Sequence, residues 1–155
     1  MIGEMPAGPR LWILSLVLLL PAIAAPIPVL TVCEVLRDPG RYHHTTVIVV
    51  GALHDADGGS WLNQNCGPAL SSISLTWSEH EFAPPPKLPK RFHWDQSLIR
   101  QKLDEVKTTT HLQPKEEWLA VFGRLETKPS GSPGFTNRAP ARLIAPDNGY
   151  LSLKE

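Results

Sequence analysis

The pattern of hydrophobic and polar positions predicts a chain built mainly from β-strands. Two apolar, β-rich runs stand out, TVIVVGAL within residues 45–54 and WLAVFGRL within residues 117–127. Each run contains one glycine near its end, Gly51 in the first and Gly123 in the second. Because glycine permits the bend or bulge by which a sheet curls, the two runs predict curved strands of a small closed, or nearly closed, β-barrel.

Three shorter segments complete the predicted strands. Residues 60–63 follow the first run after DADGG, a turn sequence typical of a hairpin. In residues 70–77 the apolar and polar positions alternate from Ile73 onward, as they do in a half-buried strand. Residues 141–145 (ARLIA) follow a loop rich in serine, proline and glycine, and they predict a fifth strand.

One long helix is predicted after a proline-rich loop. Asp95 is a good N-cap for a helix from Gln96 to about Lys107. Ile99, Leu103 and Val106 recur at helical spacing within it, so they define one apolar face. The helix is therefore expected to cover an apolar surface of the sheet.

A short helix is predicted near the start of the domain, within residues 31–38. Thr31 is a plausible N-cap, and Glu34 stands three positions later at the spacing of a capping box. The Pro39-Gly40 pair ends the helix. This short helix presents Cys33 before the first long strand begins.

The resulting order of three strands, a helix and two strands resembles the oligonucleotide/oligosaccharide-binding (OB) fold. Glycines in the first and fourth strands, here Gly51 and Gly123, are also common in that fold. The resemblance covers about residues 45–153 and lies in layout and strand pattern rather than in a family-specific motif. The chain looks most like small exported bacterial proteins of this fold. The resemblance implies a five-stranded barrel whose helix after strand three plugs one end, with the short N-terminal helix as an addition.

The expected fold class is therefore mainly β, or α+β by count, with one OB-like barrel domain over residues 31–155. An open sheet with two helices on one face is the alternative architecture. A length of 155 residues with 42% hydrophobic and 19% charged residues suits one globular domain.

The resemblance implies a binding surface on strands two and three and their flanking loops. In this sequence the matching residues are Trp61, Asn63, Gln64, Ser72, Ser74, Thr76 and Trp77. Tryptophan rings can stack on sugars or bases, and amides and hydroxyls can complete the hydrogen bonding. The alternative is that Trp61 and Trp77 fill the barrel interior.

The N-terminus predicts export. An apolar stretch at residues 11–20 follows Arg10, and Ala22-Ile23-Ala24 then supplies a small-x-small cleavage pattern. Residues 1–25 are therefore expected to be a signal peptide, which would make the protein periplasmic or secreted.

The alternative is an uncleaved anchor formed by residues 11–30, which would then be the chain's only membrane contact. Pro21, Pro26 and Pro28 interrupt this stretch and disfavour a continuous spanning helix.

Export gives a meaning to Cys33 and Cys66, the only two cysteines in the chain. An isolated pair in an oxidising compartment usually forms a disulfide. We therefore predict a structural disulfide between these two residues rather than a redox or metal site.

Charge and motifs limit the function. Lys and Arg together number 15 and so do Asp and Glu, which gives no net charge and argues against a general nucleic-acid binder. The sequence holds no Gly-x-Ser-x-Gly, His-Glu-x-x-His, phosphate-loop or dinucleotide motif, so no catalytic residue, cofactor or metal is predicted. Asp55-x-Asp57-Gly58 begins like a calcium loop but lacks the later ligands, so a hairpin turn is expected.

These observations favour a non-catalytic exported binding module whose partner is an oligosaccharide, a peptide or a protein surface of the cell envelope. A structural or stress-related envelope protein without a small ligand is the second hypothesis, and a hydrolase is a distant third.

Overall fold

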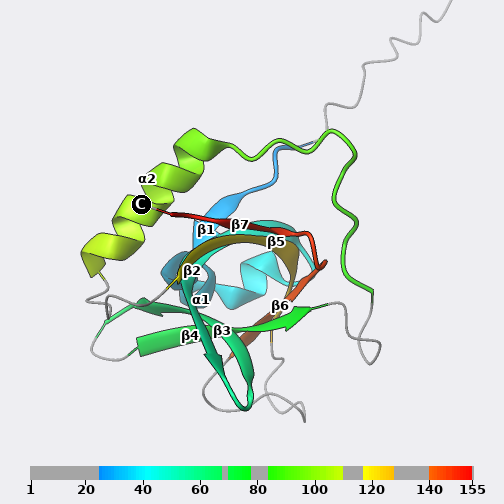
Figure 1. Ribbon diagram of the computed structural model, residues 1–155. Coiled ribbons are helices and arrows are strands. Elements are labelled where there is room, and N and C mark those ends of the chain that lie inside the picture. The colour runs from blue at the N-terminus through cyan, green and yellow to red at the C-terminus, as the bar shows by residue number, and fades with distance from the viewer. Residues whose placement is uncertain (1–24, 68–69, 78–83, 110–116, 128–139, 155) are drawn as a thin grey trace, which may run out of the picture.

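The computed structural model describes residues 25–67, 70–77, 84–109, 117–127 and 140–154 (Figure 1). The elements in chain order are β1 (Val29–Thr31), α1 (Val32–Arg37), the 3-10 helix η1 (Pro39–Tyr42), β2 (Thr46–Ala56), β3 (Gly59–Asn65), β4 (Leu70–Trp77), α2 (Gln96–Thr109), β5 (Glu117–Thr127), β6 (Ala141–Ala145) and β7 (Tyr150–Ser152).

Five strands close into a barrel in the order β2-β3-β4-β6-β5, and β5 pairs back with β2. Four of these five pairings are antiparallel, and β4 with β6 is parallel. The two glycine-containing strands lie side by side, with Gly51 opposite Leu119 and Gly123 opposite Val47. The predicted mainly β fold class and its five-stranded barrel are thus confirmed, and the layout is consistent with an OB-like fold.

The two glycines supply space as well as curvature. A Cβ atom on Gly123 would lie 2.7 Å from the Ile144 carbonyl oxygen and 2.9 Å from Leu143 Cγ, so β6 approaches β5 too closely for any side chain. A Cβ on Gly51 would lie 3.0 Å from Val32 Cγ2, where α1 enters the barrel. Each glycine therefore marks a place where another element contacts the strand backbone directly.

The helix that fills the barrel interior is α1, not α2. Val32 and Val35 of α1 are fully buried and belong to the same apolar cluster as the inward-facing strand residues. The strand members of this cluster include Val47, Val49, Leu62, Ile73, Leu75, Leu119, Val121, Leu125 and Leu143. Figure 1 shows α1 through the ring of strands.

Helix α2 packs against the outside of the barrel wall (Figure 1). Its predicted apolar face is confirmed, because Ile99, Leu103 and Val106 are buried. These residues share a cluster with outward-facing residues of β1, β2 and β5, namely Val29, Ile48, Val50, Ala120 and Phe122. The implication that the helix after strand three plugs the barrel is therefore wrong. The outer wall is itself apolar and would be exposed without α2.

Two short strands that the sequence analysis missed widen this wall. β1 runs parallel to β2, with Val29 opposite Ile48, and β7 runs antiparallel to β5. Val29 and Leu30 are buried, so the folded domain begins before the predicted start at residue 31. These two residues belong to the stretch considered above as a possible anchor.

The predicted signal peptide falls almost entirely on residues 1–24, which lie outside the described residues. Within the described ranges, no helix has the length and apolar character needed to cross a membrane.

The predicted disulfide is confirmed. Cys33 in α1 is bonded to Cys66, which directly follows β3, with 5.2 Å between the Cα atoms. The bond fastens the helix that fills the interior to the strand beside it. A disulfide of this kind suits an oxidising, extracellular-type environment.

An ion pair joins the two helices. The Lys102 ammonium of α2 donates to the carboxylate of Glu34 in α1, and both side chains are mostly buried. Glu34 also completes the predicted capping box, because Oε2 accepts from Thr31 N at 2.7 Å while Thr31 Oγ1 accepts from Glu34 N at 3.2 Å. Burial acts to raise the pKa of Glu34, but the hydrogen bonds from Lys102 and Thr31 outweigh it and leave the pKa lowered.

The partner's pKa moves in the opposite direction. Burial acts to lower the pKa of Lys102, but the hydrogen bond to Glu34 and the charges of Glu34 and Glu105 outweigh it, so the pKa is raised. The ion pair therefore contributes its full stabilisation between the ordinary pKa values of the two groups, 4.5 and 10.5.

We expect the Glu34→Gln variant to unfold more easily at neutral pH and to lose part of the acid sensitivity. Because the native pKa of Glu34 is lowered, its contribution is present above the ordinary value of 4.5 and is lost as the pH falls through the native pKa. Glutamine can still accept the capping bond, so the cost at pH 7 should be about 1 kcal/mol. Urea unfolding at pH 7 and pH 3 measures the difference. An equal gap between variant and wild type at both pH values would contradict this assignment.

Candidate functional site

The structure divides the predicted ligand-binding residues between the two faces of the barrel wall. Successive side chains of a strand point to opposite faces, and β3 pairs with β4 so that Trp61 lies opposite Ser74. Trp77 shares the inner face with Ile73 and Leu75, and Gln64 shares it with Leu62. The outer face receives Trp61, Asn63, Ser72, Ser74 and Thr76.

The outer-face residues do not form a continuous exposed platform. Asn63 and Thr76 are buried, at 5% and 9% exposure, while Trp61, Ser72 and Ser74 are half-buried. Asn63 Oδ1 has no hydrogen-bond partner among the described residues. The Trp61 ring lies 6.1 Å from that of His54 on the paired strand. Only Trp61 and the two serines therefore remain accessible on this face.

Gln64 is buried and hydrogen-bonded to both helices. Its side chain is 1% exposed; Oε1 accepts from Cys33 N at 3.0 Å, and Nε2 donates to Thr109 Oγ1 at 3.1 Å. The amide thereby links the start of α1 to the end of α2. These contacts favour a structural role for Gln64 over the predicted contact with a ligand.

Trp77 lies in a pocket at one end of the barrel. The pocket has a volume of about 290 Å³ and is lined by Leu53, Asp55, Ser60, Trp77, Glu117, Leu119 and Tyr150. The Trp77 and Tyr150 rings meet edge to face, with 5.7 Å between centroids and 70° between planes. We refer to this pocket as the mouth.

The topology explains why these residues converge. Leu53 and Asp55 stand near the end of β2, Ser60 near the start of β3, Trp77 at the end of β4, and Glu117 at the start of β5. Antiparallel pairing brings these strand ends together, and the alternation along each strand turns the side chains inward. The disulfide joins α1 to Cys66, directly after the end of β3, and α1 also contacts β4. Since Ser60 at the start of β3 lines the mouth, α1 closes the opposite end of the barrel.

The rim of the mouth is acidic and aromatic. Asp55 and Glu117 are exposed, and Glu117 Oε1 accepts a hydrogen bond from Ser152 Oγ at 2.7 Å. Tyr150 is 50% exposed and is the sole large hydrophobic side chain with high exposure in the described part of the chain. An exposed aromatic beside a concave apolar surface is typical of a contact site.

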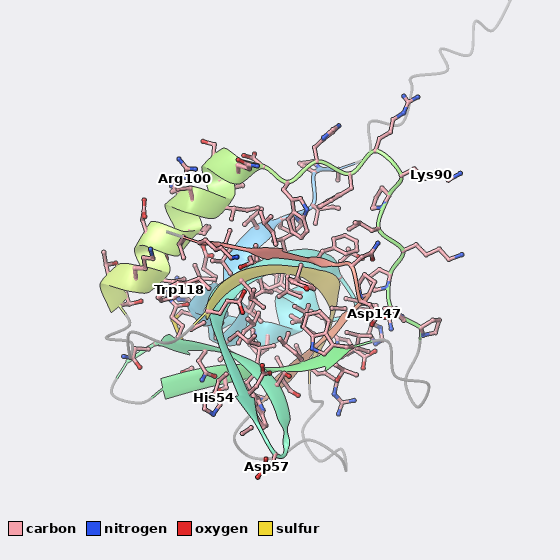
Figure 2. All side chains as sticks on the ribbon, in the orientation of Figure 1. His54, Asp57, Lys90, Arg100, Trp118 and Asp147 are labelled. Atoms are coloured by element: carbon pink, nitrogen blue, oxygen red, sulfur yellow. A yellow bond between two sulfur atoms is a disulfide. The ribbon has the colours of Figure 1, made fainter. Side chains whose placement is uncertain are left out.

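The β2–β3 hairpin beside the mouth confirms the predicted turn. β2 ends at Ala56 and β3 begins at Gly59, so Asp57 and Gly58 form a two-residue connection. Figure 2 shows Asp57 at the tip of this hairpin, beyond the barrel. Over the residues that the structure describes, no group of three or more His, Cys, Asp or Glu side chains could hold a metal ion.

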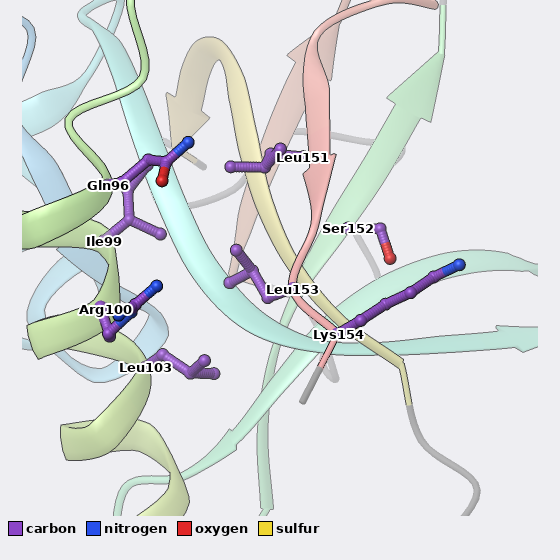
Figure 3. Close-up of a pocket in the computed structure, with 8 residues that line it drawn as sticks. All are labelled: Gln96, Ile99, Arg100, Leu103, Leu151, Ser152, Leu153 and Lys154. Carbon is purple, nitrogen blue, oxygen red and sulfur yellow. The ribbon is translucent and has the colours of Figure 1, made fainter.

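A second cavity lies between α2 and β7 (Figure 3). It has a volume of about 200 Å³, and its lining comprises Gln96, Ile99, Arg100, Leu103, Leu151, Ser152, Leu153 and Lys154. Figure 3 shows Leu151 and Leu153 reaching toward the helix, whereas the Lys154 ammonium points away from it. The apolar floor belongs to the packing of α2 on the wall, and the two cations do not converge. The mouth is therefore the stronger candidate site.

The fold and this site define a disulfide-bonded, mainly β barrel protein with one end filled by a helix and a pocket at the other end. No family model matches the chain, and neither a curated protein nor a solved structure matches it. The function must therefore be argued from the geometry of the molecule.

Most of the mouth was missed by the sequence analysis. Leu53, Asp55, Glu117 and Leu119 continue the inward alternation of β2 and β5, so that pattern could have identified them. Tyr150 had no local signal, because its position depends on the pairing of β7 with β5.

Proposed function

We propose that the protein is a non-catalytic exported binding module with an OB-like barrel, and that its ligand binds in the mouth. The mouth carries this proposal, because it is a concave site formed by inward-facing residues of four strands together with the exposed Tyr150. The disulfide and the apolar N-terminal segment support export.

The lining supports binding rather than chemistry. Over the described part of the chain it combines two leucines, two aromatic rings, two carboxylates and one serine, without a histidine, cysteine or lysine. A serine nucleophile requires an adjacent base that is itself held in place by a third group. Apolar walls with a few polar groups at the rim are instead typical of a binding pocket.

The size of the mouth favours a small group. Ligand sites usually have volumes of about 300–1,000 Å³. At about 290 Å³, the mouth has room for one side chain, one sugar ring or a small molecule. If the ligand is an oligosaccharide or peptide, one unit of it enters the barrel end and the remainder lies outside.

We expect a thermal-shift screen of the oxidised protein against peptides, envelope glycans and nucleotides to give a hit that requires Tyr150. A ligand at 100 times its Kd stabilises the fold by about 2.7 kcal/mol, which raises the Tm by several degrees. Because Tyr150 is half exposed, the Tyr150→Ala variant should fold normally but lose this shift.

The matched control is Trp61→Ala, which removes an aromatic ring from the outer face of the same barrel. Each variant is compared with its own melting point without ligand. A ligand-induced shift in Tm that survives Tyr150→Ala but disappears in Trp61→Ala would indicate a site on the outer face. It would contradict the proposal that the ligand binds in the mouth.

A further inference from the structure

We infer that the ligand group bound at the mouth is a primary ammonium attached to a short apolar body, an inference that rests on the mouth being the binding site. The ammonium lies at the rim between Asp55 and Glu117, and the apolar body enters the barrel. Three features of the mouth support this assignment: the sign of its charge, the placement of its carboxylates and the layering of its walls.

The described lining residues carry charge of a single sign. Among the residues that the structure describes, Asp55 and Glu117 are the two ionisable carboxyl groups of the mouth, and no Lys, Arg or His side chain lines it. Glu117 accepts one hydrogen bond, from the neutral Ser152 hydroxyl. A carboxylate has room for several donors, so both side chains retain free acceptor positions. An anionic ligand would meet repulsion here, whereas a cation would be attracted.

The two carboxylates approach the pocket from neighbouring strands. Glu117 lies opposite Leu53 in the β2–β5 register, and Asp55 is two residues beyond Leu53 on the same inner face. Diagonal neighbours of this kind are separated by about 7–8 Å. A primary ammonium has three donors, and one placed between the two side chains can donate to both carboxylates.

The walls are arranged in layers from the rim inward. Asp55, Glu117 and Tyr150 are exposed at the rim, whereas Leu119 is 2% exposed and Leu53 packs against the interior cluster. A cation at the rim can also approach the Trp77 and Tyr150 rings, whose π faces attract positive charge. A short alkyl group extending inward would contact the leucines. The amino-terminal residue of a peptide and a free alkylamine both have this chemistry.

The inference is tested with three probes of similar size that differ in charge: butylammonium, butanol and pentanoate. Chemical shifts of the isotope-labelled, oxidised protein report binding at the Trp77 and Tyr150 signals. We expect butylammonium to bind about tenfold more tightly than either other probe. Its affinity should fall as salt is added, because salt screens exposed charges. Leu-Gly-Gly with a free amino terminus, compared with its acetylated form, distinguishes a peptide source from a free amine.

The variants Asp55→Asn and Glu117→Gln should each weaken butylammonium binding about threefold, and about tenfold together, as expected for exposed ion pairs. Both changes preserve side-chain shape, and glutamine can still accept from Ser152. Asp57→Asn, at the tip of the same hairpin and outside the lining, is the matched control and should bind as the wild type does.

Two results would overturn the inference in different ways. If butanol and pentanoate bind at the mouth as tightly as butylammonium, and Tyr150→Ala abolishes all three, the ammonium is rejected while the mouth remains the binding site. If no probe shifts the Trp77 and Tyr150 signals, the inference and the proposed site are both contradicted.

Discussion

Reduction of the Cys33–Cys66 disulfide is expected to lower the free energy of unfolding by about 3–4 kcal/mol. The two cysteines are 33 residues apart, so the bond closes a long loop in the unfolded chain and removes much of its conformational freedom. The same bond holds α1, whose Val32 and Val35 fill the barrel interior. Its loss therefore acts on the element that closes one end of the barrel.

Urea unfolding with and without dithiothreitol measures this effect. A loss of this size in a domain of 125 residues (31–155) corresponds to a fall in Tm of about 10 °C or more. The double variant Cys33→Ser/Cys66→Ser is the control, and it should match the reduced wild type and show no response to reductant. An unchanged unfolding midpoint after verified reduction would contradict a stabilising role for the disulfide.

The Gly123→Ala variant is expected to lose about 1–3 kcal/mol of folding stability, or to fold poorly. The added methyl group would lie 2.7 Å from the Ile144 carbonyl oxygen and 2.9 Å from Leu143 Cγ. The first contact is with backbone, so it cannot be relieved by a change of rotamer. The β5–β6 pairing that helps to close the barrel must then shift.

Two other glycines provide a graded comparison by chemical denaturation. A Cβ on Gly51 would meet Val32 Cγ2 at 3.0 Å, so Gly51→Ala should cost less than Gly123→Ala. A Cβ on Gly40 would come no closer than 3.9 Å to Asp38 Oδ1, so Gly40→Ala should change stability by less than about 0.5 kcal/mol. Equal stabilities of the Gly40 and Gly123 variants would show that β5 and β6 do not approach as described.

The candidate site was only partly predictable, because the resemblance to the OB fold points to two strands and does not distinguish the two faces of those strands. The predicted binding residues include Trp77, which the structure places in the mouth, and also Gln64, which links α1 to α2. Trp61 and Trp77 both lie on the predicted strands, yet they point to opposite faces of the wall. The alternation of side chains along each strand places the two tryptophans on different faces. Knowing only that each lies in a strand does not distinguish them.

The sequence by itself determined the local structure of this protein. β-branched runs, turn residues, capping positions and helical periodicity act over a few residues, which is why the five barrel strands, both helices and the Asp57-Gly58 turn were all predicted. The cysteine pair was also predictable, because an exported chain with two cysteines offers a single pairing.

Only the tertiary structure decided which helix fills the barrel and at which end the pocket lies. An apolar helical face shows that a helix must be covered, but not which surface covers it. Here β1 and β7 widen the outer wall enough to bury α2, and the disulfide fastens α1 at the interior. The mouth follows from that arrangement, because its residues come from five strands, and those of β2, β5 and β7 are far apart in the chain and meet only when the barrel closes.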